Sequence, residues 1–338
     1  MSYTNGLDDP SSVFQTTLYS GTGSQQSITN GGNSDLQPDW LWIKERNGTS
    51  SHQLVDSVRG FHLRVESNNN SAELDAGQAG ATNQNVTSFN SDGFGVKNGG
   101  AVNESGKTYV AWQWKKQAGV FDIITYEGTG SAQNISHNLG VVPTMIIIKD
   151  RDNSRNWGVY NVGMGNTSAM YLDLSNDQGT EAGWWNNTTP TSSVFTVNTR
   201  NEVNAGSQSF VSYLVGNKQG VSQCGVYTGN GSNDGTFVYT GFSVGWLIIK
   251  RIAGSTGSWL MVDSKRDPFN SGGSANELGA NEGNASNDLA GDFKIDLLSN
   301  GFKLRDDLGD ANAGANYIYM AFADQPLVTS KGVPATAK

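Results

Sequence analysis

The sequence predicts an all-β protein made of three tandem antiparallel β-sandwich repeats of a lectin-like or jelly-roll-like kind. A short apolar run that ends in basic charge occurs three times, as Trp40–Arg46, Met145–Arg151 and Trp246–Arg251. The lysines of these runs are 105 and 101 residues apart, which is the size of one sandwich domain. Glycine, asparagine and serine fill the segments between short aromatic or β-branched runs, as expected of turns that join strands.

Composition narrows the range of partners. The 338 residues carry a net charge of −9 and only 16% charged residues, without the clustered basic side chains that a nucleic-acid partner requires. The single Cys224 excludes an intrachain disulfide, and no Cys/His set has zinc-ligand spacing. We therefore expect no metal bound by Cys or His side chains, and no cofactor. The polar N-terminus lacks a signal-peptide core, and no apolar run is long enough for a transmembrane helix, so we expect synthesis in a cytoplasm without membrane insertion.

The repeat period predicts the domain boundaries. We expect an N-terminal arm, three sandwich repeats and a C-terminal tail, at residues 1–15, 16–118, 119–221, 222–325 and 326–338. The joints at Lys115–Val120 and Lys218–Ser222 are short. Short joints predict a compact or rod-like array and not a flexible string of modules.

Each repeat opens on a tyrosine followed by Gly-x-Gly. The tyrosines are Tyr19, Tyr126 and Tyr227, at spacings of 107 and 101 residues. Glycine dihedrals suit a turn here, and a phosphate loop is rejected because no helix with Lys-Ser/Thr follows. Next comes the apolar run itself, which predicts a strand that is buried in the core and emerges at its edge with the basic residue.

The second strand of a repeat ends in Asp-Ser-x-Arg in two of the three copies. These are Asp56 with Arg59 and Asp263 with Arg266, whereas Asn161 takes the place of the aspartate in repeat two. One interpretation is a ligand site in repeats one and three. The alternative, which we favour, is an ion pair that braces a loop, with the serine hydroxyl capping a turn.

A long polar loop follows in each repeat, at 67–84, 163–191 and 271–289. Loops of this length commonly bind something or interlock with a neighbour. The second contains Trp184 and Trp185, which predict either a stacking surface for sugars or a partner, or rings folded back over the sandwich. Beyond these loops, Asp92-Gly93 and Asn300-Gly301 predict hairpins with type I′ turns, which need positive φ at both turn residues.

Nothing in the sequence assembles a catalytic set. A sandwich glucanase would place Glu-x-Asp-x-x-Glu on one strand, and this spacing is absent. None of His52, His62 and His137 recurs between repeats, so no triad histidine is indicated. We therefore predict a non-enzymatic protein with no catalytic residues; calcium bound by loop carboxylates stays open.

Several segments of the N-terminal arm and of repeat one resemble structural proteins from tailed phages of marine bacteria. They are Asp8–Thr16, Leu36–Lys44, Asp56–Gly60, Ser88–Phe94 and Thr108–Trp114. The resemblance is good over repeat one, partial over repeat three and weak over repeat two. In those proteins a lectin-like sandwich module recurs, often beside tail-fibre genes. The resemblance transfers no binding or catalytic residues.

The resemblance implies a virion protein of the tail fibre or another surface appendage, involved in assembly and host attachment. Expected partners are other virion proteins and copies of the chain itself, with a trimer as the family-level expectation. An adhesin that recognises host surface glycans is the alternative function, and a polysaccharide depolymerase is a third.

Overall fold

The computed structural model describes residues 7–76, 85–270, 273–286, 293–329 and 331–335. The chain is all-β, as the sequence predicted, with antiparallel sheets and two helices of a single turn in the described part. We name its parts lobe 1 (residues 14–114), lobe 2 (121–215) and lobe 3 (222–326). The predicted boundaries between repeats fall in the connections between these lobes. The predicted arm and tail, and two of the long loops, extend in part outside the described residues.

Lobe 1 combines a six-stranded main sheet of order β1-β9-β3-β4-β5-β6 with a small sheet of order β2-β8-β7. The short 3-10 helix η1 (Pro10–Ser12) precedes it and packs on β1. The elements of lobe 1 are β1 (Phe14–Ser20), β2 (Gln26–Ile28), β3 (Trp40–Glu45), β4 (Gln53–Asp56), β5 (Gly60–Val65), β6 (Leu74–Asp75), β7 (Val86–Asn90), β8 (Gly93–Val96), α1 (Gly100–Asn103) and β9 (Thr108–Trp114).

Lobe 2 repeats this plan. Its main sheet has the order β10-β17-β12-β13-β14-β15, and its small sheet pairs β11 with β16. The elements are β10 (Phe121–Glu127), β11 (Gln133–Ser136), β12 (Met145–Asp150), β13 (Gly158–Asn161), β14 (Ser168–Tyr171), β15 (Gly179–Thr180), β16 (Val194–Val197), α2 (Asn201–Asn204) and β17 (Ser209–Val215).

In lobe 3 the main sheet has the order β18-β25-β20-β21-β22 and the small sheet the order β19-β24-β23. The strands are β18 (Ser222–Thr228), β19 (Phe237–Tyr239), β20 (Phe242–Arg251), β21 (Leu260–Asp263), β22 (Leu278–Gly279), β23 (Ile295–Leu298), β24 (Gly301–Leu304) and β25 (Asn316–Pro326). Strand β25 also contacts η1 from the other end of the chain.

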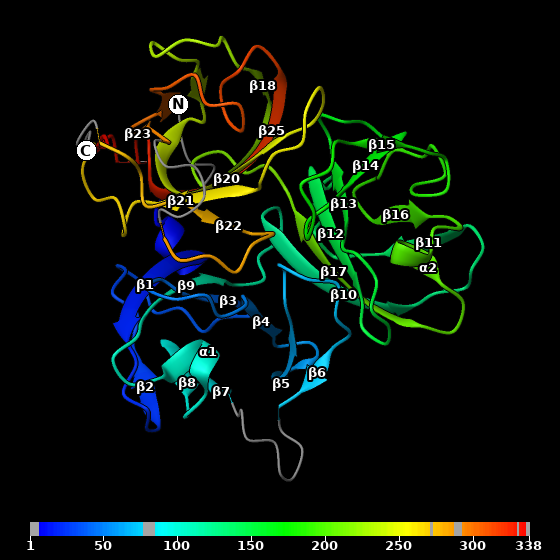
Figure 1. Ribbon diagram of the computed structural model, residues 1–338, viewed down its shortest axis with the longest axis horizontal. Coiled ribbons are helices and arrows are strands. Elements are labelled where there is room, and N and C mark those ends of the chain that lie inside the picture. Colours follow the sequence, from blue (N-terminus) through cyan, green and yellow to red (C-terminus); the bar gives the residue numbers. More distant parts are fainter. Residues whose placement is uncertain (1–6, 77–84, 271–272, 287–292, 330, 336–338) are drawn as a thin grey trace.

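The three main sheets surround one shared core at the centre of the molecule (Figure 1). Aromatic rings from different lobes meet there: Trp40 stacks on Tyr213 with ring centroids 4.4 Å apart, and Phe14 stacks on Phe322 at 5.2 Å. Trp114 meets Trp246 edge-on at 5.3 Å. Burying a large apolar side chain stabilises a fold by roughly 1.5–3 kcal/mol, so this shared core makes the array compact and not rod-like.

Each lobe has a second core between its main sheet and its small sheet. Ile43, Phe94 and Tyr109 belong to that of lobe 1, and the corresponding clusters of lobes 2 and 3 contain residues of those lobes alone. The central strands β3, β12 and β20 are therefore covered on both faces. This explains why they read as continuous apolar runs and do not alternate with polar residues.

The repeated opening phrase is held by a buried asparagine from the segment before the last strand of each lobe. In lobe 2, Asn204 Oδ1 accepts a hydrogen bond from Thr129 N (2.9 Å), and Asn204 Nδ2 donates to Ser131 O (2.6 Å). A Cβ at Gly128 would lie 2.1 Å from Ala205 O, and Gly130 has a φ of +70°. The first glycine therefore permits a close approach, and the second adopts a left-handed conformation. Asn103 and Asn312 occupy the same place in the other lobes.

Two details differ from the predictions. Lys44, Lys149 and Lys250, at the basic ends of the runs, do not emerge at an edge but are fully buried. The glycine hairpins form, but the two-residue turns are Ser91-Asp92 and Ser299-Asn300. Neither turn has a positive φ, so they are not type I′. Each glycine instead begins the following strand, where a side chain would collide with a neighbouring carbonyl.

Candidate functional site

The Asp-Ser-x-Arg segment of lobe 1 lies at the seam with lobe 2. Arg59 Nε and Asp56 Oδ2 are 2.6 Å apart, and both side chains are fully buried. Tyr213 of lobe 2 donates a hydrogen bond to Asp56 (2.9 Å) and accepts one from Arg59 (3.0 Å). Arg59 also pairs with Glu73 at 2.7 Å, and Ser57 Oγ donates to Asp39 (2.6 Å). Buried ionic groups need such partners, so these residues join two lobes.

Lobe 3 uses its copy of the motif in the same way at the seam with lobe 1. Arg266 Nε and Asp263 Oδ2 are 2.6 Å apart with both side chains buried. Trp112 Nε1 of lobe 1 donates to Asp263 (3.0 Å), and the Arg266 guanidinium lies 5.5 Å from the centre of a Trp112 ring. Trp112 and Tyr213 occupy the same position in the last main-sheet strands of their lobes, so the two seams are equivalent.

The third seam, where lobe 3 meets lobe 2, explains why repeat two lacks the motif. The chain positions that correspond to Asp56 and Arg59 hold Asn161 and Met164, and the position that corresponds to Tyr213 holds Met320. Met320 carries no N–H or O–H group that could donate to a carboxylate. A buried aspartate would be costly without such a donor. The Asp-Ser-x-Arg motif and the side-chain donor that would face it are therefore both absent from this seam.

Trp184 and Trp185 lie inside lobe 2, with exposed fractions of 3% and 2%. Trp185 Nε1 donates to Ser168 O (2.9 Å), and its ring meets Tyr160 edge-on. The Arg200 guanidinium covers Trp184, with Cζ 4.9 Å from the centre of the ring. Both rings therefore fold back into lobe 2, which is the second of the two arrangements predicted for them. Neither tryptophan ring is exposed for stacking on a sugar.

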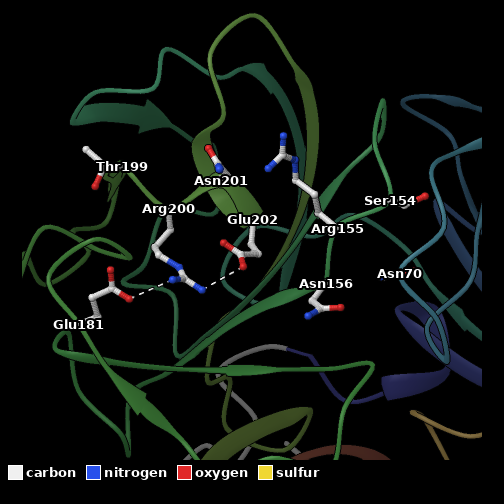
Figure 2. Close-up of a pocket in the computed structure, with 9 residues that line it drawn as sticks. All are labelled: Asn70, Ser154, Arg155, Asn156, Glu181, Thr199, Arg200, Asn201 and Glu202. Carbon is white, nitrogen blue, oxygen red and sulfur yellow. Dashed lines mark hydrogen bonds and ion pairs between the residues drawn. The ribbon is translucent and has the colours of Figure 1, made fainter.

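Arg200 also lines a polar pocket between lobe 2 and a loop of lobe 1 (Figure 2). Its volume is about 440 Å³, and every side chain that lines it is polar. The lining residues are Asn70, Ser154, Arg155, Asn156, Glu181, Thr199, Arg200, Asn201 and Glu202. Figure 2 shows Glu202 lying between the side chains of Arg200 and Arg155.

Arg200 is held rigidly in this pocket. Its Nη1 lies 3.1 Å from Glu181, and its Nη2 lies 2.9 Å from Glu202 and donates to Tyr171 Oη (2.7 Å). Burial acts to lower the pKa of Arg200, but Glu202, Tyr171 and Glu181 outweigh it, so the pKa is raised. The arginine therefore stays charged, and two carboxylates balance it.

Arg155 is fixed from the opposite side. Its Nε forms an ion pair with the buried Asp150 at 2.8 Å. Within the described part of the chain, its terminal nitrogens have no partner, and neither do the side chains of Ser154, Asn156, Thr199 and Asn201. The pocket therefore offers hydroxyl, amide and guanidinium groups that can bond to a ligand.

Buried Lys149 holds the two walls of the pocket together. Its Nζ donates to Arg155 O (2.7 Å) in lobe 2 and to Asn70 O (3.2 Å) in lobe 1. Burial lowers the pKa of this lysine to about 8, and nearby Asp150 and Asp173 oppose that shift. Burial also raises the pKa of Asp173, to about 6.

Among the described residues, no three His, Cys, Asp or Glu side chains are grouped so that they could hold a metal ion. Within the same residues, no helix is long and apolar enough to cross a membrane.

One family model matches residues 9–326, which include all three lobes. The chain belongs to this family. It is described as a domain of unknown function (DUF7483). The DUF7483 match runs through every seam in one piece, in agreement with a core to which all three lobes contribute. No curated protein matches the chain.

The pocket residues of this DUF7483 protein were not singled out from the sequence. A signal was present in Arg200-Asn201-Glu202, because the corresponding positions of lobe 1 are Gly99-Gly100-Ala101. Charged residues in one repeat opposite small residues in another indicate a local role. The contribution of Asn70 was not predictable, because it depends on how two lobes meet.

Proposed function

We propose that the chain is a non-enzymatic structural protein of a phage virion, a component of a tail fibre or another surface appendage that acts in assembly and host attachment. The observation that carries the proposal is that the side chains of both Asp-Ser-x-Arg segments are used in packing. Each segment forms a buried ion pair that joins two lobes and has no opening for a substrate; the pairs are Asp56–Arg59 and Asp263–Arg266.

The resemblance of repeat one to tailed-phage proteins supports a place in the virion. An appendage must keep its shape under mechanical load, and a core shared by three lobes suits that task. Assembly with other virion proteins, or with copies of the chain as a trimer, belongs to the same proposal.

Mass spectrometry of purified phage particles tests the location. We expect peptides of the chain in the particles, and gold-labelled antibodies against it should mark a fibre or appendage in electron micrographs. Finding the chain in the lysate but not in the particles would overturn the proposal.

A second assay tests the absence of enzymatic activity. The purified protein is incubated with host-envelope polysaccharide, and released reducing ends are measured. We expect none above the buffer control. Release that disappears in the Glu202→Gln variant would make the chain a depolymerase.

A further inference from the structure

We propose that the pocket of Figure 2 is a binding site for a neutral saccharide. The proposal deepens host attachment: its biological role rests on the proposed function, whereas binding itself can be measured on the isolated protein.

The first argument is charge. Arg200 is paired with Glu181 and Glu202, and Arg155 with Asp150, so no cation in the lining is left without a carboxylate. A phosphate or sulfate would meet Glu181 and Glu202 and be repelled. A metal ion would have to displace Arg200 from both carboxylates. A neutral ligand avoids both costs.

The second argument is the pattern of donors and acceptors. A sugar hydroxyl donates one hydrogen bond and accepts others, so it is best met by groups of both kinds. Asn156 and Asn201 each offer a donor and an acceptor, Ser154 and Thr199 offer hydroxyls, and Arg155 offers donors only. A lipid or an aromatic ligand would leave these groups unpaired, because the lining contains no apolar side chain.

The third argument is rigidity. Lys149 fixes the main chain on both walls, Asp150 fixes Arg155, and Arg200 is held by three polar partners and the Trp184 ring. A site that is already ordered loses less entropy when a ligand binds. Lobes 1 and 3 lack the Arg-Asn-Glu segment, so we expect one such site per chain.

The test is titration calorimetry of the full chain with neutral sugars as probes: D-glucose, D-galactose, D-mannose, N-acetylglucosamine and their disaccharides, with inorganic phosphate as the charged comparison. We expect at least one sugar to bind, and phosphate not to. The double variant Asn156→Ala/Asn201→Ala removes two hydrogen-bonding groups and should weaken binding by about tenfold or more. Asn138→Ala removes an exposed amide of lobe 2 outside the pocket and should leave binding unchanged.

No binding of any probe, tighter binding of phosphate, or equal binding by the double variant and wild type would overturn the site. Circular dichroism and the unfolding midpoint establish that each variant is folded. Failure of the site is distinct from failure of the proposed function: a chain found in the particle without sugar affinity loses only the site. A chain that binds sugar but is absent from the particle keeps the site and loses the virion role.

Discussion

Tyr213 of lobe 2 donates a hydrogen bond to Asp56 of lobe 1 across 2.9 Å, and its ring stacks on Trp40. The two residues are 157 positions apart in the chain. One side chain thus takes part in both the shared core and the polar seam around it.

Tyr213→Phe should therefore destabilise the protein. The change keeps the ring but leaves Asp56 and Arg59 each without one partner, which costs about 1–3 kcal/mol. Urea unfolding measures the loss. The control is Tyr239→Phe on the exposed surface of lobe 3, which should stay within about 0.5 kcal/mol of wild type. Equal effects of the two changes would contradict the role of the seam.

Asn161→Asp tests the seam where the motif has been lost. A carboxylate placed there keeps the backbone N–H of Gly163 as a donor, but Met164 and Met320 offer it neither a cation nor a side-chain N–H or O–H group, so it should cost about 3–5 kcal/mol. Adding Met164→Arg and Met320→Tyr restores the partners that the other seams have, and should recover part of the loss. Calorimetric melting of the single and triple variants decides the matter; an unchanged melting temperature for Asn161→Asp alone would refute the explanation.

His52 predicts a dependence of stability on pH. Its Nδ1 accepts a hydrogen bond from Trp42 (2.7 Å), so Nε2 carries the proton and donates to Gly279 O of lobe 3 (2.9 Å). Burial and the nearby Lys44 lower the pKa of His52 from 6.5 to about 3. Between these values the unfolded chain binds more protons than the folded one. Stability is thus lost as the pH falls through this window, by up to about 1.4 kcal/mol per pH unit.

The variant His52→Gln keeps a donor and an acceptor but does not titrate. Urea unfolding of both proteins at about pH 4 and about pH 6.5 gives the difference, in which the contributions of other groups cancel. We expect a smaller loss on acidification in the variant. Parallel behaviour would show that His52 is not the responsible group.

Gly128→Ala tests the opening turn of lobe 2. The new Cβ would lie 2.1 Å from Ala205 O, so the backbone must move, and we expect a loss of about 3 kcal/mol or more. Gly179→Ala is the matched control in the same lobe, because no atom outside its chain neighbours lies within 4 Å of the new Cβ. Similar unfolding midpoints for the two variants would contradict the close approach.

The sequence was sufficient to predict the main strands and the all-β class, because both depend on local patterns of residues. The runs at Trp40, Met145 and Trp246 are apolar at successive positions, which already indicates burial on both faces. The shared core itself was not predicted, since a sandwich needs only one buried face per sheet. The burial of Lys149 was missed because its carbonyl partners come from loops, one of them in another lobe.

The candidate site was harder to predict from the sequence than the fold, because it depends on contacts between residues that are far apart in the chain. Asp-Ser-x-Arg could be identified as an ion pair from spacing alone, but its partners Tyr213 and Trp112 could not. The rings of Trp184 and Trp185 gave no sequence signal of which face they occupy. Arg200 covers the ring of Trp184 and itself lines the polar pocket.

The cyclic arrangement of seams has a consequence for the origin of the chain. Each lobe contacts its neighbours with the same surfaces, so a gene for one lobe would encode a protein that closes into a homotrimer. Duplication and fusion would then free each seam to diverge on its own. The aspartate and its aromatic donor are both present at two seams and both absent at the third, as expected of seams that vary independently of one another.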